Sequence, residues 1–203
     1  MLEAKELECE RGGRSLFRSL SFALNRGEAL RVAGANGRGK TSLLRILCGL
    51  LPPAQGEVRW KGTPIRALKE DFSRELVYLG HAPAVKDDLT AAENLAIACR
   101  LAGNAQSDSA VAEALAQLGL GGVHQPLRKM SQGQRRRAAL ARLALSASVP
   151  LWLLDEPFSA LDSSGIEVLR KILENHLKRG GAIAFTTHQD PGMGAAQVVD
   201  LDA

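Results

Sequence analysis

The sequence lacks any apolar run that approaches the length of about 18 residues needed for a membrane-spanning helix. Residues 1–6 are too polar for the apolar region of a secretory signal peptide. Internal repeats and low-complexity tracts are also missing from the 203 residues. These absences argue against an integral membrane protein and a secreted one, so we expect a cytoplasmic chain that cannot cross a membrane unaided.

Cysteine is scarce, and the three residues Cys9, Cys48 and Cys99 lie far apart without a C-x-x-C pair. Their odd number suits a reducing compartment, and we expect them to be small core residues. The net charge of +4 is too small to indicate a partner by itself. Residues 135–137, three consecutive arginines, are the only tight basic cluster. We expect the solvated face of a helix there and no nucleic-acid partner.

The sequence does contain alternating strand and helix patterns, which predict an α/β fold with a parallel core sheet. Residues 149–154 form an apolar run typical of a strand buried on both faces, and residues 182–187 a last core strand. Short apolar stretches separated by turn residues in 1–33 predict an N-terminal antiparallel β portion. We expect a single domain over 1–203, with a helical subdomain at approximately 84–148.

Helix boundaries are marked by capping residues. Thr90 and Glu93 form a capping-box pattern at the start of one helix. Asp108 or Ser109 can cap the next helix, which Gly119 should end.

A glycine-rich loop fits the phosphate-binding pattern G-x-x-x-x-G-K-[ST] at every fixed position. Its residues are Gly34, Ala35, Asn36, Gly37, Arg38, Gly39, Lys40 and Thr41, followed in the helix by Ser42. A strand pattern precedes the loop and a helical pattern follows it, so backbone N–H groups can converge on anionic oxygens. Lys40 would then reach the β- and γ-phosphates of a nucleotide, and the Thr41 hydroxyl would bind Mg²⁺.

Two carboxylates, Asp155 and Glu156, follow the apolar run directly. The carboxyl end of a core strand lies beside the phosphate loop in sheets of this kind. Asp155 would hold Mg²⁺ through water. Glu156 would orient or deprotonate the water that attacks the γ-phosphate.

Together these motifs resemble those of ABC transporter nucleotide-binding subunits over essentially the whole chain. Residues 34–41 match the Walker A motif and residues 151–156 the Walker B motif with its catalytic glutamate. Residues 130–134 resemble the LSGGQ signature, residues 159–162 match the D-loop, and His188 matches the switch histidine. The resemblance implies a P-loop NTPase of ABC type that hydrolyses ATP with Mg²⁺.

The resemblance also implies that two subunits form a homodimer around two ATP molecules. Ser131, Gly133 and Gln134 of one subunit would then receive the γ-phosphate held by the other, and His188 would bind that phosphate as well. The Ser131–Gln134 pair is also a capping box, which by itself only starts a helix.

Three positions depart from the family pattern. Gln132 precedes Gly133 in the signature, where Gly is usual. His81 stands where the Q-loop normally has Gln, and we assign it to the metal group with Thr41 and Asp155. Arg11 stands where an aromatic residue usually stacks on adenine, and a guanidinium plane can stack on a base as well.

Within this family, His81 and the run Thr186–Gln189 resemble the ATPase subunits of cytochrome c maturation (haem exporter) systems. That resemblance implies a peripheral location on the cytoplasmic side of the inner membrane, with separate transmembrane subunits in contact around residues 81–86. It also implies ATP hydrolysis that drives release of a haem-loaded chaperone.

Other hypotheses remain open from the residues alone. The chain could serve another small ABC exporter or be a P-loop nucleotide kinase. A soluble ABC protein of DNA repair or translation is disfavoured, because it needs a long coiled-coil insert or two nucleotide sites per chain and this sequence has neither. A degenerate subunit that only binds nucleotide is disfavoured by Lys40, Asp155, Glu156 and His188.

Overall fold

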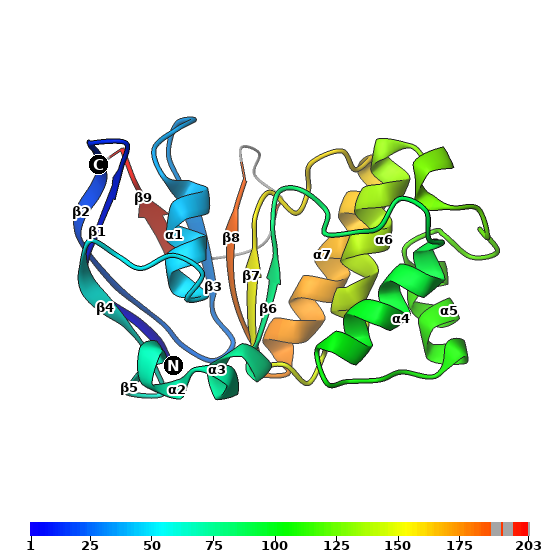
Figure 1. The fold of residues 1–203 in the computed structure, drawn as a ribbon, viewed down its shortest axis with the longest axis horizontal. Coiled ribbons are helices and arrows are strands. Elements are labelled where there is room, and N and C mark those ends of the chain that lie inside the picture. Colours follow the sequence, from blue (N-terminus) through cyan, green and yellow to red (C-terminus); the bar gives the residue numbers. More distant parts are fainter. Residues whose placement is uncertain (188–191, 193–196, 203) are drawn as a thin grey trace.

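Two sheets and a group of helices make up the fold in the computed structural model, which describes residues 1–187, 192 and 197–202 (Figure 1). The antiparallel sheet has the order β2-β1-β4-β5, with β1 at Leu2–Arg11, β2 at Arg14–Leu24, β4 at Gln55–Trp60 and β5 at Thr63–Pro64. The parallel sheet has the order β6-β7-β8-β3-β9, with β6 at Leu76–Leu79, β7 at Leu151–Leu154, β8 at Ala182–Thr186, β3 at Ala29–Ala33 and β9 at Gln197–Asp200.

The parallel sheet is covered on both faces, which explains the apolar run of β7. Leu151 and Leu153 pack into one core cluster, while Trp152 and Leu154 pack into another on the opposite face. Successive side chains of a strand point to opposite faces, so a strand with two covered faces needs apolar residues throughout. The prediction of a parallel core sheet is confirmed.

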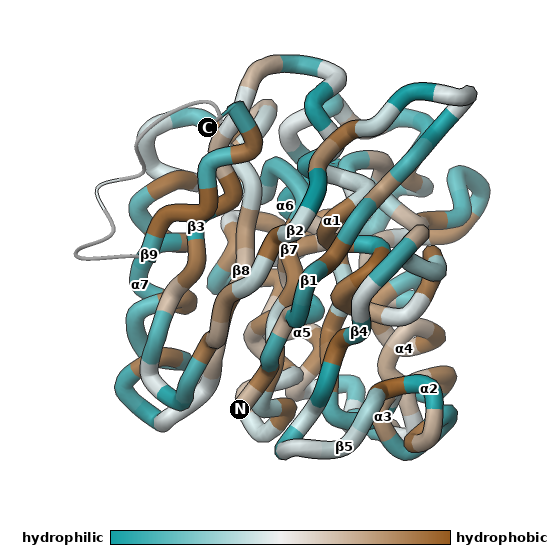
Figure 2. Tube along the Cα trace, turned by 90° about the vertical axis from the view of Figure 1, so that its left-hand side faces the viewer, coloured by the Kyte–Doolittle hydropathy of each residue, from teal (hydrophilic) through white to brown (hydrophobic). Residues whose placement is uncertain are grey.

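Helix α1 (Lys40–Leu47) lies between the two sheets (Figure 1). Its apolar residues Leu43, Leu44, Ile46 and Leu47 are buried in the cluster that also holds residues of β1 and β7. Figure 2 shows hydrophobic residues along β3 and β9, whereas β1 and β4 alternate between hydrophilic and hydrophobic residues. The antiparallel sheet therefore covers α1 with one face and meets solvent with the other.

The other face of the parallel sheet carries the longer helices, on the right in Figure 1. They are α4 (Ala91–Leu101), α5 (Asp108–Gln117), α6 (Gln132–Ala144) and α7 (Ser163–Lys178). Two short helices, α2 (Ile65–Leu68) and α3 (Glu70–Arg74), precede β6, and a single 3₁₀ turn spans Leu127–Lys129. Among the described helices, none is both long and apolar enough to span a bilayer.

Most of the boundary predictions agree with the structure. Thr90 and Glu93 form both hydrogen bonds of a capping box, and Gly119 follows the C-cap of α5 with a φ of 74°. The cap of α5 is wrong by one residue, because Ser107 and not Asp108 accepts the bond from the backbone of Ala110. The expectation that β8 is the last core strand is also wrong, because β9 pairs with β3 beyond it.

Candidate functional site

The carboxyl ends of four parallel strands place the functional residues at one edge of the sheet. The phosphate loop follows β3, Gly80 follows β6 and Asp155 follows β7, while Thr186 ends β8. Parallel strands point the same way, so segments far apart in sequence meet at this edge.

The phosphate loop wraps around the ammonium group of Lys40. Gly34, Gly37 and Gly39 have φ values of 136°, 83° and 101°, which side chains with a Cβ rarely adopt. Lys40 is 8% exposed, and its Nζ donates to the carbonyl oxygens of Gly34 at 2.6 Å and Ala35 at 3.2 Å. Its positive charge therefore lies inside the loop, at the N-terminus of α1, where anions are stabilised.

The side-chain carboxylate of Asp202, near the C-terminus, binds the phosphate loop. The backbone N–H of Ala35 donates to Asp202 at 2.6 Å, and the Arg38 guanidinium forms an ion pair with the same side chain. Arg38 lowers the pKa of Asp202 below its usual value. Asp202 could not be predicted from the sequence, because it is 167 residues from Ala35 and belongs to no motif. The side chain of Arg38 is therefore directed to this carboxylate, while its backbone remains part of the phosphate loop.

Thr41, Asp155 and Thr186 form a small cluster of oxygen atoms. The Thr41 hydroxyl donates to one carboxylate oxygen of Asp155 at 2.8 Å, and the Thr186 hydroxyl donates to the other at 2.8 Å. Hydroxyl and carboxylate oxygens are ligands that Mg²⁺ prefers, so Thr41 and Asp155 fit this metal. The described residues contain no group of three or more His, Cys, Asp or Glu side chains placed to hold a metal. Water and phosphate oxygens would therefore have to supply the remaining ligands.

Glu156 has an unusual backbone conformation, with a φ of 51°. Its N–H donates to the Thr186 hydroxyl at 2.8 Å, and its carbonyl accepts from the Arg136 Nη2 atom at 2.7 Å. A residue with a Cβ in this left-handed region carries a strain of about 1–2 kcal/mol, which its surroundings must offset. Glu156 lines the same cleft as Lys40 and Thr41.

The expectation for residues 135–137 is right about the helix and wrong about Arg136. Its side chain is 4% exposed and donates to four backbone carbonyls in the loops after β6 and β7. Burial lowers the pKa of Arg136, and the charges of Asp155 and Glu156 act in the opposite direction. A pattern of three arginines carries no signal for which one faces inward, because that depends on what packs against the helix.

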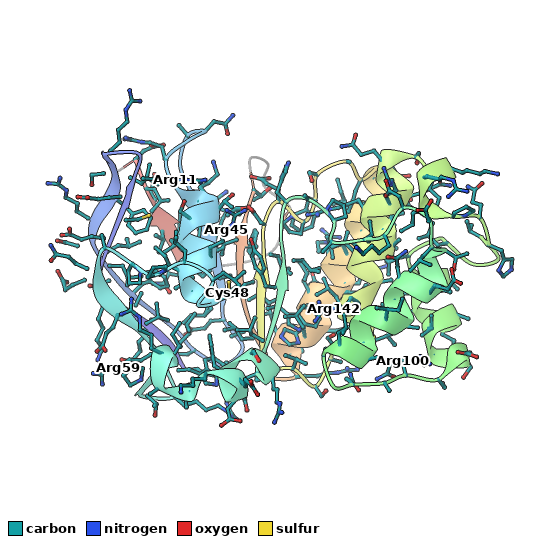
Figure 3. The ribbon with its side chains drawn as sticks, in the orientation of Figure 1. Arg11, Arg45, Cys48, Arg59, Arg100 and Arg142 are labelled. Carbon is teal, nitrogen blue, oxygen red and sulfur yellow. The ribbon has the colours of Figure 1, made fainter. Side chains whose placement is uncertain are left out.

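A cleft of about 470 Å³ joins these groups to the antiparallel sheet. Arg11, Arg14 and Leu16 line one side, and His81 lines another. Arg11 and Arg14 pair across the β1–β2 turn, and Figure 3 shows Arg11 on the side where α1 begins. The cleft is therefore lined by two arginines from the antiparallel sheet, of which only Arg11 was expected from the sequence.

The signature residues lie apart from this cleft in the same chain. Ser131 caps α6 and forms the full capping box with Gln134. A Cβ on Gly133 would come within 2.9 Å of the Ala160 carbonyl oxygen, so glycine also permits close packing of α6 on the following loop. None of these three signature residues is among those that line the cleft. His188 lies outside the described residues.

Comparison with known proteins shows a family match over most of the chain. The family described as ABC transporter matches residues 17–159. The chain is 51% identical to the cytochrome c biogenesis ATP-binding export protein CcmA of Nitrosomonas europaea, over 99% of this chain and 94% of that one. It is 47% identical to the CcmA protein of Escherichia coli K12, over 93% and 89% of the two chains.

Solved structures show the same fold at lower identity. The ATP-binding subunit of an ABC transporter superposes with a TM-score of 0.82 at 24% identity, over 93% of this chain and 79% of that chain. The ATP-binding cassette MJ0796, a dimer in a post-hydrolysis state with ADP and Pi, superposes with a TM-score of 0.80 at 24% identity, over 93% and 88%.

Proposed function

Because the chain belongs to the ABC transporter family, and within it to the CcmA proteins, we propose that it is the ATP-hydrolysing subunit of a cytochrome c maturation export system. The observation that carries this proposal is the sequence identity to CcmA relatives, which is about one half over nearly their full length. The cleft supports it, since it brings the phosphate loop, Asp155 and Glu156 together.

In hydrolysis, the chain's own residues would bind the nucleotide and move one proton. Lys40 and the N–H groups at the start of α1 bind the phosphates of ATP. Glu156 orients the water that attacks the γ-phosphorus and accepts its proton, as the bond between the γ-phosphorus and the bridging oxygen breaks and ADP leaves. The resemblance to the family assigns His188, which lies outside the described residues, to the γ-phosphate. Thr41 and Asp155, with His81 nearby, would hold Mg²⁺, which supplies charge neutralisation at the phosphate oxygens.

The base of the nucleotide would lie between Arg11 and Arg14. Guanidinium planes stack on aromatic rings, so this pair takes the place of the aromatic residue found in other members of the family.

Two copies would complete each site. Ser131, Gly133 and Gln134 lie outside the cleft of their own chain, and a helix N-terminus with a hydroxyl group is suited to a γ-phosphate. A second copy brings this group to the phosphate loop of the first. The dimeric MJ0796 cassette supports the pairing of two copies.

The membrane subunits would contact the junction of the parallel sheet and α4. A groove there is lined by Arg74, Lys86, Ile97, Leu101 and Arg142, and the Leu101 side chain is 84% exposed. Closure of the dimer on ATP would transmit work through this contact, because ATP binds the closed state better. The protein would be peripheral on the cytoplasmic side of the inner membrane. ATP hydrolysis would drive the export of haem or the release of a haem-loaded chaperone.

Deletion and complementation in the source organism test this function. Cells without the protein should lose c-type cytochromes, and a wild-type copy should restore them. A Lys40→Ala copy should still recover the membrane subunits in a pull-down from membranes but should not restore cytochromes. Normal cytochrome c assembly in the deletion strain would contradict the proposal.

A further inference from the structure

One buried arginine connects three segments of the site. Arg136 lies in the second turn of α6 and is 4% exposed. Its Nη1 atom donates to the carbonyls of Gly80 at 3.1 Å and His81 at 3.2 Å. Its Nη2 atom donates to the carbonyls of Asp155 at 2.9 Å and Glu156 at 2.7 Å. A single side chain thus joins the signature helix to the loops after β6 and β7.

Burial of this charge needs a reason beyond helix packing. Removing a charged group from water has a large free-energy cost, which hydrogen bonds offset only when their geometry is good. The neighbouring Arg135 and Arg137 instead form ion pairs with Asp87 and Asp162, whose side chains are 59% and 64% exposed. An apolar residue would fill the position of Arg136 without that cost, but it would leave four carbonyls without this donor.

The strained backbone of Glu156 supplies that reason. The direction of its Cβ is set by a φ of 51°, which places the residue in the left-handed region. Thr186 binds the N–H of this residue and Arg136 binds its carbonyl, so a polar group on each side stabilises the conformation. Loss of either group would let the residue relax and would move its carboxylate.

The same guanidinium faces the loop after β6. A cavity of about 70 Å³ between this loop and α6 is lined by Arg136, Ala82, Val85 and Asn94. Because both loops bind one planar group with a fixed fork of donors, a shift of one loop changes the hydrogen bonds available to the other.

We propose that Arg136 is a positioning residue for ATP hydrolysis, which holds Glu156 in its left-handed conformation and couples that conformation to the loop at Gly80 and His81. The inference rests on the proposed function, because it concerns the glutamate of the same site. Among the described residues, the hydrogen bonds of Arg136 go to carbonyl groups, so it would act on the reaction through Glu156.

The test compares Arg136→Gln and Arg136→Lys with the matched control Arg135→Gln, which removes an exposed ion pair one residue away. The turnover number of Arg136→Gln should fall about 10- to 100-fold, because small misplacement of a catalytic group has effects of this size. KM for ATP and the melting temperature should stay near wild type. Lysine keeps the charge without the fork and should recover part of the rate.

Amide hydrogen exchange gives a readout that needs neither nucleotide nor activity. In Arg136→Gln, exchange should rise together in peptides covering residues 79–85 and 155–160 and stay unchanged along the rest of α6. Arg135→Gln should match wild type in both measurements.

Exchange that rises in one loop alone, or in neither, would overturn the inference, as would wild-type turnover in Arg136→Gln. General loosening of α6 with a lower melting temperature would show a purely structural role and would also overturn it. If the wild-type protein itself fails to hydrolyse ATP, the proposed function fails, and the exchange data still decide whether Arg136 couples the two loops.

Discussion

At the scale of single residues, the polar groups at the strand ends are linked to one another by hydrogen bonds. Asp155 accepts from two hydroxyls, and the Thr186 hydroxyl in turn accepts from the N–H of Glu156. The proposed roles of Glu156 as a base and of Asp155 as a metal ligand therefore fall on adjacent side chains and can be separated by substitution. A substitution that keeps the shape of Glu156 should affect only proton transfer.

Glu156→Gln should bind ATP with wild-type affinity and hydrolyse it about 10²- to 10⁴-fold more slowly, because an amide cannot accept the proton of the attacking water. Phosphate release under saturating ATP and equilibrium nucleotide binding measure the two effects. Glu167→Gln, on the exposed side of α7, is the control and should keep full turnover. Wild-type turnover in Glu156→Gln would remove this residue from the mechanism.

His176 predicts the pH dependence of stability. It is 2% exposed and stacks on Trp152 with ring centroids 3.6 Å apart. Burial lowers its pKa from 6.5 to about 4, so the unfolded chain binds a proton between these values while the folded chain does not. Stability from this residue is complete above pH 6.5 and is lost as the pH falls toward 4.

The loss between pH 8 and pH 5 should be about 2 kcal/mol from His176 alone. In His176→Phe, which keeps an aromatic ring against Trp152, the change in the free energy of unfolding between pH 8 and pH 5 should be smaller by about 2 kcal/mol. Urea unfolding of both proteins at both pH values measures this change. An equal loss of stability in both proteins would show that other groups cause the acid sensitivity.

At the scale of elements, two helices begin with the same capping box but serve different purposes. Thr90 and Glu93 start α4, and Ser131 and Gln134 start α6, each with a side-chain bond in both directions. Local stability should therefore depend equally on both caps. Only the N-terminus of α6 is proposed to meet a phosphate.

Thr90→Ala and Ser131→Ala should each reduce the free energy of unfolding by about 1 kcal/mol. Only Ser131→Ala should also weaken ATP-driven dimer formation and turnover, because only that hydroxyl is proposed to reach the γ-phosphate of a second copy. Chemical denaturation and ATPase assays on both variants separate the two effects. Equal loss of turnover in both would indicate that Ser131 is only a cap.

At the scale of the whole molecule, the layered arrangement separates the two halves of the proposed site. The antiparallel sheet, α1 and the parallel sheet carry the cleft, and the longer helices on the opposite face carry the signature (Figure 1). Because the signature residues Ser131, Gly133 and Gln134 do not line the cleft of their own chain, we propose that a second copy supplies the missing half of the site.

ATP with Mg²⁺ should convert Glu156→Gln protein from a monomer to a dimer of twice 21.7 kDa, measured by light scattering after size exclusion. Slow hydrolysis keeps the nucleotide in place, so the dimer should accumulate. Adding Lys40→Ala to this variant should prevent dimer formation, because the phosphates lose their ammonium partner. A protein that stays monomeric at saturating ATP would contradict the two-copy site.

Local patterns determined most of the fold and half of the site. Three kinds of feature each occupy a few consecutive residues: the phosphate loop, the apolar run of β7 and the two capping boxes. The interactions that form each of them lie within those few residues. Hydrogen bonds of caps, glycine conformations and burial of a continuous apolar strand need no knowledge of distant segments. For that reason these features could be predicted from the sequence.

Only the tertiary structure decided which residues meet across the sheet edge. Asp202 binds Ala35 and Arg38, Thr186 binds Asp155, and Arg136 is buried against backbone carbonyls while Arg135 and Arg137 form ion pairs with exposed carboxylates. Each of these contacts depends on which segment packs against a side chain, and sequence spacing does not predict that segment. The left-handed backbone of Glu156 belongs with them, because a strained residue is held by partners that only folding brings together.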